Sequence, residues 1–230
     1  MKVAIHQPHY FPWEGYISKM KDVDKFILMD EVQLTDSSPM YRHALLTLKG
    51  EKKYITIPFE KNDYKHKSYK NILINTQIDW QKNHINFLKE NYSKSPFYGE
   101  IMDLISCIFT KKYKYICDVT VDTILLMRKI FNISTDIVLQ SDLNYPNDSK
   151  KNQLVLDLCI ASNADYYLSG QGAKKYMELE PFDKSNVIVE FQSFKQTEYS
   201  QHCSREFIAG LSILDMLLSV GIKKTKECFI

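Results

Sequence analysis

The sequence has little that would indicate a disulfide-bonded, zinc-binding or membrane protein. Its five cysteines are odd in number, scattered and never arranged as CxxC, which is typical of reduced thiols. No apolar run reaches the roughly 18 residues that a membrane-spanning helix needs. The opening MKVAIHQPHY lacks the apolar core and the small-residue cleavage site of a signal peptide. We therefore expect a soluble, cytoplasmic protein without a structural metal.

An excess of charge of one sign is also missing. Thirty Lys and Arg face 28 Asp and Glu, for a net charge of +2, so the balance does not call for nucleic acid or an anionic membrane as partner. Neither GxxxxGK[ST], a complete GxGxxG, HExxH nor GxSxG is present, which removes four common catalytic or nucleotide-binding signatures. The 230 residues, 44% of them hydrophobic, suit a single domain over residues 1–230.

What the sequence does have is a series of short apolar stretches, separated in several places by helical patterns. Stretches of this kind, rich in β-branched and aromatic residues, are typical of strands covered on both faces of a parallel sheet. The fold class predicted is α/β, with a Rossmann-like, mostly parallel sheet and flanking helices. The predicted strands are 2–6, 25–30, 135–140, 165–169 and 186–192, and the predicted helices are 13–23, 149–163, 171–179 and 207–221, the last ended by Gly221.

Two regions depart from this alternation. Residues 44–58 read as a hairpin with Gly50 in its turn, and Pro58 places its second strand at an edge or marks its end. Residues 79–132 carry apolar side chains at helical spacing. We predict that this second region is a helical insert or cap packed on the sheet.

Ligands of open α/β sheets bind beyond the carboxyl ends of the strands. The first strand runs into HQPHYFPW, where Pro8 and Pro12 stiffen an extended loop that can hold His6 and Gln7 in fixed directions. Histidine is well matched to proton transfer near neutral pH. The alternative is that His6 is an ordinary core histidine, but the aromatic and histidine cluster as a whole favours a functional loop.

Other strand ends supply weaker candidates. Gly170 and Gly172 follow a strand and open a predicted helix, which suits an anion site, although a tight turn can need glycine for backbone reasons alone. Asp30 follows the second strand, and Arg42 is one of only three arginines, a side chain suited to a bidentate grip on phosphate. Cys203, beside His202, is the one thiol near the predicted crevice and a weak candidate nucleophile.

Several motifs together resemble the WbqC-like proteins. HQPHYFPWEGYISKM, DKFILMDEVQ, the Ser38 to Arg42 segment, YITIPF, YLSGQGAKKYM and EYSQHCSREFIAGLSILDMLLSVG occur here in the order seen in that family. The resemblance runs over nearly the whole chain. The matching positions are His6, Gln7, Pro8, Pro12, Trp13, Gly15, Tyr16, Lys19, Asp30, Val32, Gln33, Ser38, Arg42, Ser169, Gly170, Gly172, Ala173, Tyr199, Gln201 and Asp215.

The resemblance implies a role in bacterial surface-polysaccharide (O-antigen) biosynthesis. The activity it implies is transfer of an aminoacyl (glycyl) or acyl group to the amine of a nucleotide-linked amino sugar. It leaves the donor open among a free amino acid with ATP, an acyl thioester on a carrier protein and a coenzyme A ester. The alternative is a non-catalytic factor that binds the sugar nucleotide or a carrier protein in the same pathway.

We assign expected roles on this basis. His6, or Asp30 acting through it, would be the base, and Gln7 or the Gly170–Gly172 amides would stabilise the oxyanion. The substrate-binding candidates are Trp13, Tyr16, Lys19, Gln33, Ser38, Arg42, Ser169, Gly170, Gly172, Tyr199 and Gln201. The expectation common to all of them is that His6, Arg42 and Gly170 line one cavity.

Overall fold

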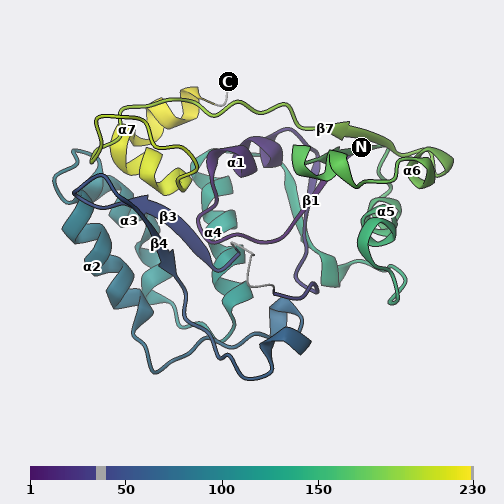
Figure 1. Ribbon diagram of the computed structural model, residues 1–230, viewed down its shortest axis with the longest axis horizontal. Helices are drawn as coiled ribbons and strands as arrows, with labels where there is room; N and C mark the ends of the chain where they lie inside the picture. The colour runs from purple at the N-terminus through teal and green to yellow at the C-terminus, as the bar shows by residue number, and fades with distance from the viewer. Residues whose placement is uncertain (35–39, 229–230) are drawn as a thin grey trace.

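The apolar stretches predicted as strands form one parallel sheet in the computed structural model, which describes residues 1–34 and 40–228. Its order is β5-β2-β1-β6-β7, and every neighbouring pair is parallel. The strands are β1 (Lys2–His6), β2 (Lys25–Leu28), β5 (Asp136–Leu139), β6 (Tyr166–Ser169) and β7 (Ile188–Phe191). The predicted Rossmann-like α/β fold is confirmed (Figure 1); β1 has the predicted bounds, and the other four strands are slightly shorter than predicted.

Both faces of the sheet are buried because apolar side chains occupy successive positions along the strands. Val3 and Ile5 of β1 pack with the helices on one face, and Ala4 between them packs with those on the other. The helices of the first face are α5 (Lys151–Ala161) and α6 (Glu180–Lys184), and those of the second include α1 (Glu14–Lys21) and α4 (Ile116–Ile130). The chain therefore crosses from one face to the other between β5 and β6.

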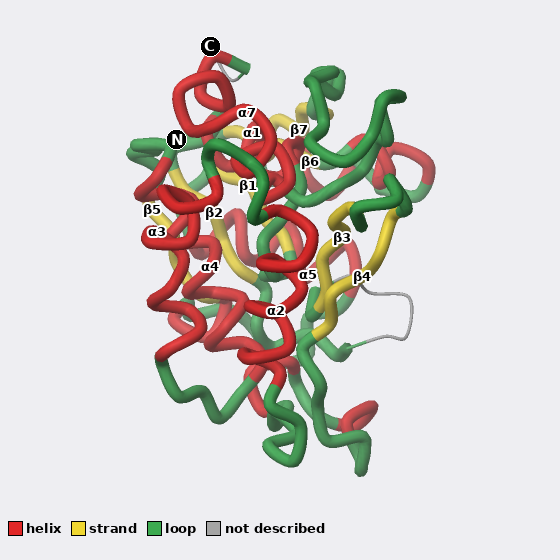
Figure 2. The backbone as a smooth tube through the Cα atoms, turned by 90° about the vertical axis from the view of Figure 1, so that its left-hand side faces the viewer, coloured by secondary structure: helices red, strands yellow, loops and turns green. Residues whose placement is uncertain are grey.

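The region 79–132 is helical, as predicted. It contains α2 (Trp80–Tyr92), α3 (Tyr98–Thr110) and α4, which lie beside one another in Figures 1 and 2. Asp79 caps α2, its carboxylate accepting a hydrogen bond from the backbone N–H of Lys82 at 3.1 Å. Apolar residues of these helices share one core with the α1 face of the sheet.

The predicted hairpin is present as β3 (Arg42–Leu46) and β4 (Lys52–Thr56), paired antiparallel. It begins two residues earlier than predicted and ends before Pro58. Gly50 has a φ of 75° in the turn, a left-handed conformation that favours glycine. Ala44 and Leu46 pack on Leu211, which precedes the last helix.

Two predicted helices are wrong in extent. Residues 171–179 form only a short 3₁₀ turn, η4 (Gln171–Lys175), because the segment is almost wholly exposed and has no apolar face to bury. The final helix α7 runs over Ile213–Glu227, starting later than predicted at the Ser212 cap. Gly221, with a φ of 78°, interrupts α7 rather than ending it.

No helix within residues 1–34 and 40–228 is long and apolar enough to cross a membrane.

Candidate functional site

The strand order reverses between β1 and β6, and a large cavity opens at the carboxyl ends of these two strands. Its volume is about 820 Å³, within the range of cavities that take small-molecule ligands. We call it the switch-point cavity, since crevices at this position bind ligands in open α/β sheets. Its lining includes His6 and Gln7 after β1, Lys19 of α1, Lys151 and Asn152 of α5, and Ser169, Gly170 and Gly172 after β6.

His6 presents a proton-accepting nitrogen in this cavity. Its Nδ1 lies 3.1 Å from the carbonyl oxygen of Gln7; because a carbonyl can only accept, Nδ1 carries the proton and Nε2 the lone pair. Burial lowers the pKa of His6 well below its ordinary value, with smaller contributions from His9 and Lys19. The imidazole is therefore neutral at physiological pH, with a lone pair on Nε2.

The rings around His6 fix its orientation. His9 and Tyr16 lie edge-on to it, with ring centroids at 4.9 and 4.7 Å, and the Tyr16 hydroxyl donates to the Gln7 carbonyl oxygen at 3.1 Å. Tyr16 is almost completely buried. It supports the loop that carries His6 and Gln7 and does not line the cavity, although it was predicted to bind the substrate.

Lys19 brings an unpaired positive charge to the same cavity. Its side chain is buried, and its Nζ donates to the Ile5 carbonyl oxygen at 3.3 Å. No carboxylate of the described residues pairs with it, and burial lowers the pKa of Lys19 to about 8. A buried ammonium without an acidic partner, facing a cavity, is suited to an anionic ligand.

The Gly170–Gly172 turn contributes space rather than a helix dipole. Because η4 is a five-residue 3₁₀ turn, the helix N-terminus predicted here is absent. Neither glycine has a positive φ, and a Cβ added at either would meet no atom within 4 Å. The packing of the protein therefore does not require glycine at these positions, and both glycines line the cavity with open space where a side chain would stand.

The sequence-based reasoning missed the start of α5. Lys151 and Asn152 line the cavity, and the preceding Lys150 makes no side-chain cap, so the first turn of an 11-residue helix without a side-chain cap forms part of its wall. The signal was available, because the predicted helix 149–163 follows the carboxyl end of a predicted strand. Instead, the helix N-terminus at the cavity was predicted after Gly170 and Gly172, where the structure has only the 3₁₀ turn η4.

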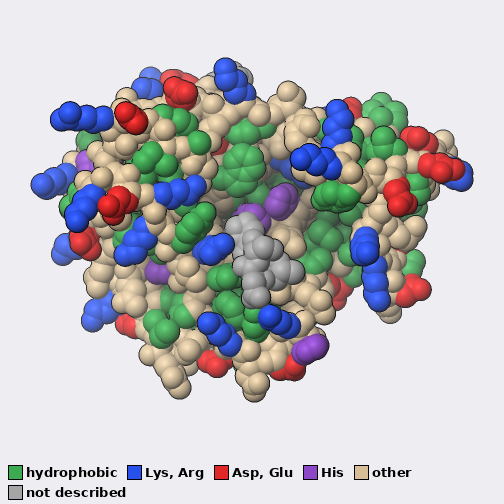
Figure 3. All heavy atoms as spheres, in the orientation of Figure 1, with side chains coloured by type: hydrophobic (Ala, Val, Ile, Leu, Met, Phe, Trp, Pro, Cys, Tyr) green, Lys and Arg blue, Asp and Glu red, His purple; other side chains and the backbone are tan. Residues whose placement is uncertain are grey.

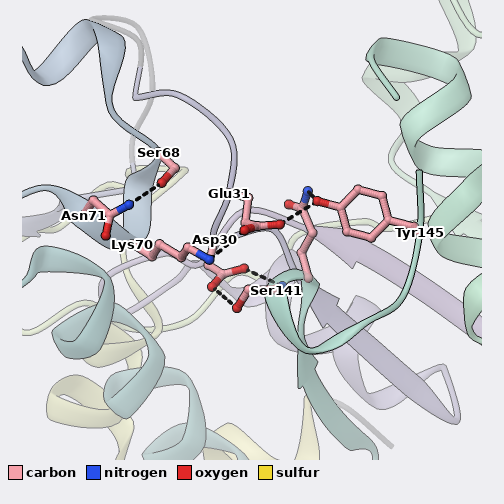
Figure 4. Close-up of polar contacts among 8 residues, drawn as sticks. Asp30, Glu31, Ser68, Lys70, Asn71, Ser141 and Tyr145 are labelled. Carbon is pink, nitrogen blue, oxygen red and sulfur yellow. Dashed lines mark hydrogen bonds and ion pairs between the residues drawn. The ribbon is translucent and has the colours of Figure 1, made fainter. Parts of the chain in front are cut away.

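Asp30 lies outside this cavity, and its carboxylate is already satisfied (Figure 4). It accepts hydrogen bonds from the backbone N–H and the hydroxyl of Ser141, at 3.0 and 2.7 Å. The neighbouring Glu31 accepts from Lys70 and Tyr145, both at 2.6 Å. Asp30 lines a separate cavity of about 470 Å³ with the start of α4. The expectation that it acts through His6 has no support in this geometry.

Arg42 and Trp13 line another, smaller pocket of about 150 Å³, which we call the hairpin pocket. Its walls come from the opening loop (His9, Trp13), the hairpin (Arg42, His43, Tyr54) and the segment before α7 (Ser212). The expectation that Arg42 shares one cavity with His6 and Gly170 is therefore wrong. The edge-on contact of His6 with His9 joins the walls of the two spaces.

The remaining candidates are held in structural contacts. The Tyr199 hydroxyl donates to buried Asp215 at 2.7 Å, and Gln201 bonds both backbone groups of Ile208. Gln33 is exposed and bridges to Ser68. Cys203 contacts the Asn91 carbonyl oxygen, and burial raises the pKa of its thiol. Ser38 lies outside the described residues.

Fold and cavity together define an α/β protein with a ligand-sized crevice at its strand-order reversal. The chain belongs to the WbqC-like protein family, whose model matches residues 7–227, so the resemblance seen in the motifs is confirmed. A relative in Mycobacterium tuberculosis, named uncharacterized protein Rv1507c, is 29% identical over 225 residues, covering 96% of this chain and 94% of the relative. No solved structure matches the chain.

Proposed function

We propose that this chain is an amide-forming transferase that places an aminoacyl (glycyl) or acyl group on the amine of a nucleotide-linked amino sugar, in the biosynthesis of a surface polysaccharide. The observation that carries the proposal is the placement of His6, a neutral base with its Nε2 available, at the wall of a cavity that also holds an unpaired ammonium. Family membership supports the same reading.

The chemistry requires a base, because an amine is protonated and unreactive at neutral pH. Nε2 of His6 would take a proton from the ammonium of the sugar, and the freed nitrogen would attack the carbonyl carbon of an activated acyl donor. The C–N bond forms and the C–S or C–O bond to the leaving group breaks. The attacking nitrogen gives up a second proton after the attack; one of its two protons is passed by the imidazole to the leaving group and the other goes to solvent. Backbone N–H groups at the wall can bind the oxyanion of the tetrahedral intermediate.

The nucleotide part would be bound by the rest of the cavity. Lys19 offers an ammonium, the first turn of α5 offers N–H groups, and the Gly170–Gly172 turn leaves space for close approach of a pyrophosphate. Arg42 and Lys19 were both expected to hold the pyrophosphate; Lys19 lines this cavity, whereas Arg42 lies in the hairpin pocket. A volume of about 820 Å³ accommodates a ligand of nucleotide-sugar size.

The test is a mass-spectrometric assay of amide formation. Uridine- and thymidine-linked amino sugars are incubated with amino acid plus ATP, with a carrier-bound thioester or with a coenzyme A ester. His6→Gln is expected to lower turnover by roughly a hundredfold or more, and His66→Gln, which changes an exposed histidine, serves as the matched control. Product formed at full rate by His6→Gln would remove His6 as the base.

The non-catalytic alternative predicts a different pattern. A sugar nucleotide would bind, no donor would yield product, and His6→Gln would weaken binding no more than other wall substitutions.

A further inference from the structure

The hairpin pocket is not used by the proposed chemistry, yet it contains polar groups that are costly to bury without a ligand. It lies between the opening loop and the hairpin β3–β4. In Figure 3 the middle of the face shown is hollowed, and histidine side chains lie there among hydrophobic ones. Three features of the pocket define what it can bind: Arg42, His43 and the pocket volume.

Among the described residues that line the pocket, Arg42 supplies the only formal charge, and none is acidic. Its guanidinium stacks on the ring of Tyr54, with Cζ 4.6 Å from the ring centroid. The side chain makes no ion pair with any described residue, and its Nε is buried without a hydrogen-bond partner. An arginine held rigidly by stacking, with an unsatisfied donor, is preorganised for a carboxylate or a phosphate.

His43 is the second unsatisfied group. His43 is about 6% exposed, its ring stacks on Tyr10 with centroids 4.7 Å apart, and its Nδ1 has no hydrogen-bond partner in the part of the chain that the structure describes. Leaving such a nitrogen buried and unpaired is unfavourable. The nearby His84 is different, because its two nitrogens bond the Tyr10 hydroxyl and the Thr56 carbonyl oxygen. The unpaired histidine is the one that faces the pocket.

The size of the pocket limits the ligand. A cavity of about 150 Å³ holds a group the size of benzene, which excludes a nucleotide sugar and admits a compact acid. Ser212 cannot contribute a donor, since its hydroxyl already donates to the Phe11 carbonyl oxygen. Arg42 and His43 are the lining residues with buried polar atoms that lack a hydrogen-bond partner among the described residues, and we expect these two to meet the ligand.

We propose that the hairpin pocket is a second binding site, which takes a compact anionic group, a carboxylate or a phosphate, on Arg42 and His43. The inference does not rest on the proposed function, because the pocket and the switch-point cavity have no lining residue in common. A small acid bound there would lie across the opening loop from the switch-point cavity, with His9 as part of the intervening wall.

Trp13 provides a local readout. The chain has two tryptophans; Trp80 is 5% exposed, whereas Trp13 is 38% exposed and lines the pocket. Quenching by acrylamide therefore reports mainly on Trp13. Acetate and inorganic phosphate are titrated separately into the full chain, with ionic strength held constant by chloride, and calorimetry follows the same titrations.

The expected result is saturable protection of Trp13 by at least one of the two anions, with affinity reduced tenfold or more in Arg42→Gln. Arg205→Gln, which removes the same charge at a different cavity, should leave it unchanged. Protection by acetate alone identifies a carboxylate site, and protection by phosphate alone a phosphate site. His43→Phe, which keeps the ring and removes the nitrogens, should weaken binding less than Arg42→Gln does.

Titrations that never saturate, or an equal loss in Arg42→Gln and Arg205→Gln, would overturn the inference, because both indicate general charge screening. Nucleotide-sugar binding measured in Arg42→Gln separates this result from the proposed function. If the compact anion fails to bind while the nucleotide sugar binds, only the hairpin-pocket inference is lost. The reverse pattern removes only the switch-point proposal.

Discussion

β1 and β2 lie side by side in the sheet, with His6 opposite Leu28, and yet their carboxyl ends are built differently. At the end of β1, His6 and the nearby Lys19 of α1 have no acidic partner among the described residues, and burial lowers the pKa of both. At the end of β2, Lys70 pairs with Glu31, whose hydrogen bond raises the pKa of Lys70. A polar side chain at a strand end is thus free to meet a ligand only where the fold has not already satisfied it.

The largest expected difference between the ends of β1 and β2 is in ligand binding, and it should appear when Lys19 and Lys70 are replaced. Lys19→Met removes an unpaired buried ammonium and should weaken binding of a uridine or thymidine diphosphate by tenfold or more, since a hydrogen bond to a charged group contributes about 1.5–3 kcal/mol. Lys70→Met removes a paired, partly exposed ammonium and should leave binding near the wild-type value. Calorimetric titration of both variants checks this.

Equal affinities in the two lysine variants would mean that the ends of β1 and β2 do not differ in ligand binding. Lys19→Met should not reduce stability, because an apolar side chain of similar length replaces a buried charge.

The second effect concerns Asp30. Asp30→Ala leaves the backbone N–H and the hydroxyl of Ser141 without their acceptor, so the free energy of unfolding should fall by about 2 kcal/mol. Urea unfolding measures the loss. Turnover per folded molecule should stay close to the wild-type value, and a hundredfold loss without a loss of stability would return Asp30 to the catalytic group.

The third effect is a dependence of stability on pH. Burial lowers the pKa of His6 well below its ordinary value and that of His9 to about 4, so below about pH 6.5 the unfolded chain binds more protons than the folded one. Stability should therefore fall as the pH drops from 6.5 towards 5, by up to about 1.4 kcal/mol per unit for each such histidine. Buried His43 and His84 act in the same direction.

The contribution of Glu31, at the end of β2, to stability should change over a different, more acidic pH range. The hydrogen bonds from Lys70 and Tyr145 lower the pKa of Glu31, so its contribution persists above its ordinary pKa and is lost only in more acidic solution. Urea unfolding at pH 7.5, 6.5 and 5.5 tests the histidine contribution, with His66→Gln, which changes an exposed histidine, as the control. Equal stability at pH 6.5 and 5.5 would contradict the lowered histidine pKa values.

The residues that follow each strand could be predicted from the sequence. The candidates at the ends of β1 and β6 therefore include residues that do line one cavity: His6, Gln7, Lys19, Ser169, Gly170 and Gly172. The sequence could not predict which of the strand-end groups are already paired. The partner of Asp30 is Ser141, 111 residues further along the chain, and no local pattern encodes that contact. Arg42 was misplaced for a similar reason, because the position of the hairpin depends on its packing against Leu211.

The smallest expected effect on stability is that of replacing Gly170. It tests whether glycine is needed there by the fold or leaves room for a ligand. Gly170 has a φ of −74° and a ψ of 150°, which alanine adopts without strain, and a Cβ there meets no protein atom within 4 Å. Gly170→Ala should therefore change the free energy of unfolding by no more than about 0.5 kcal/mol, with a gain more expected than a loss.

The same methyl group would occupy the switch-point cavity, so the affinity for a uridine or thymidine diphosphate should fall. Gly99→Ala is the matched control, since its Cβ also meets nothing within 4 Å but lies on α3, away from the cavity. Calorimetry on the two variants separates the cases. Unchanged affinity in Gly170→Ala would show that the ligand does not approach this turn, and the strand-end comparison would then rest on His6 and Lys19 alone.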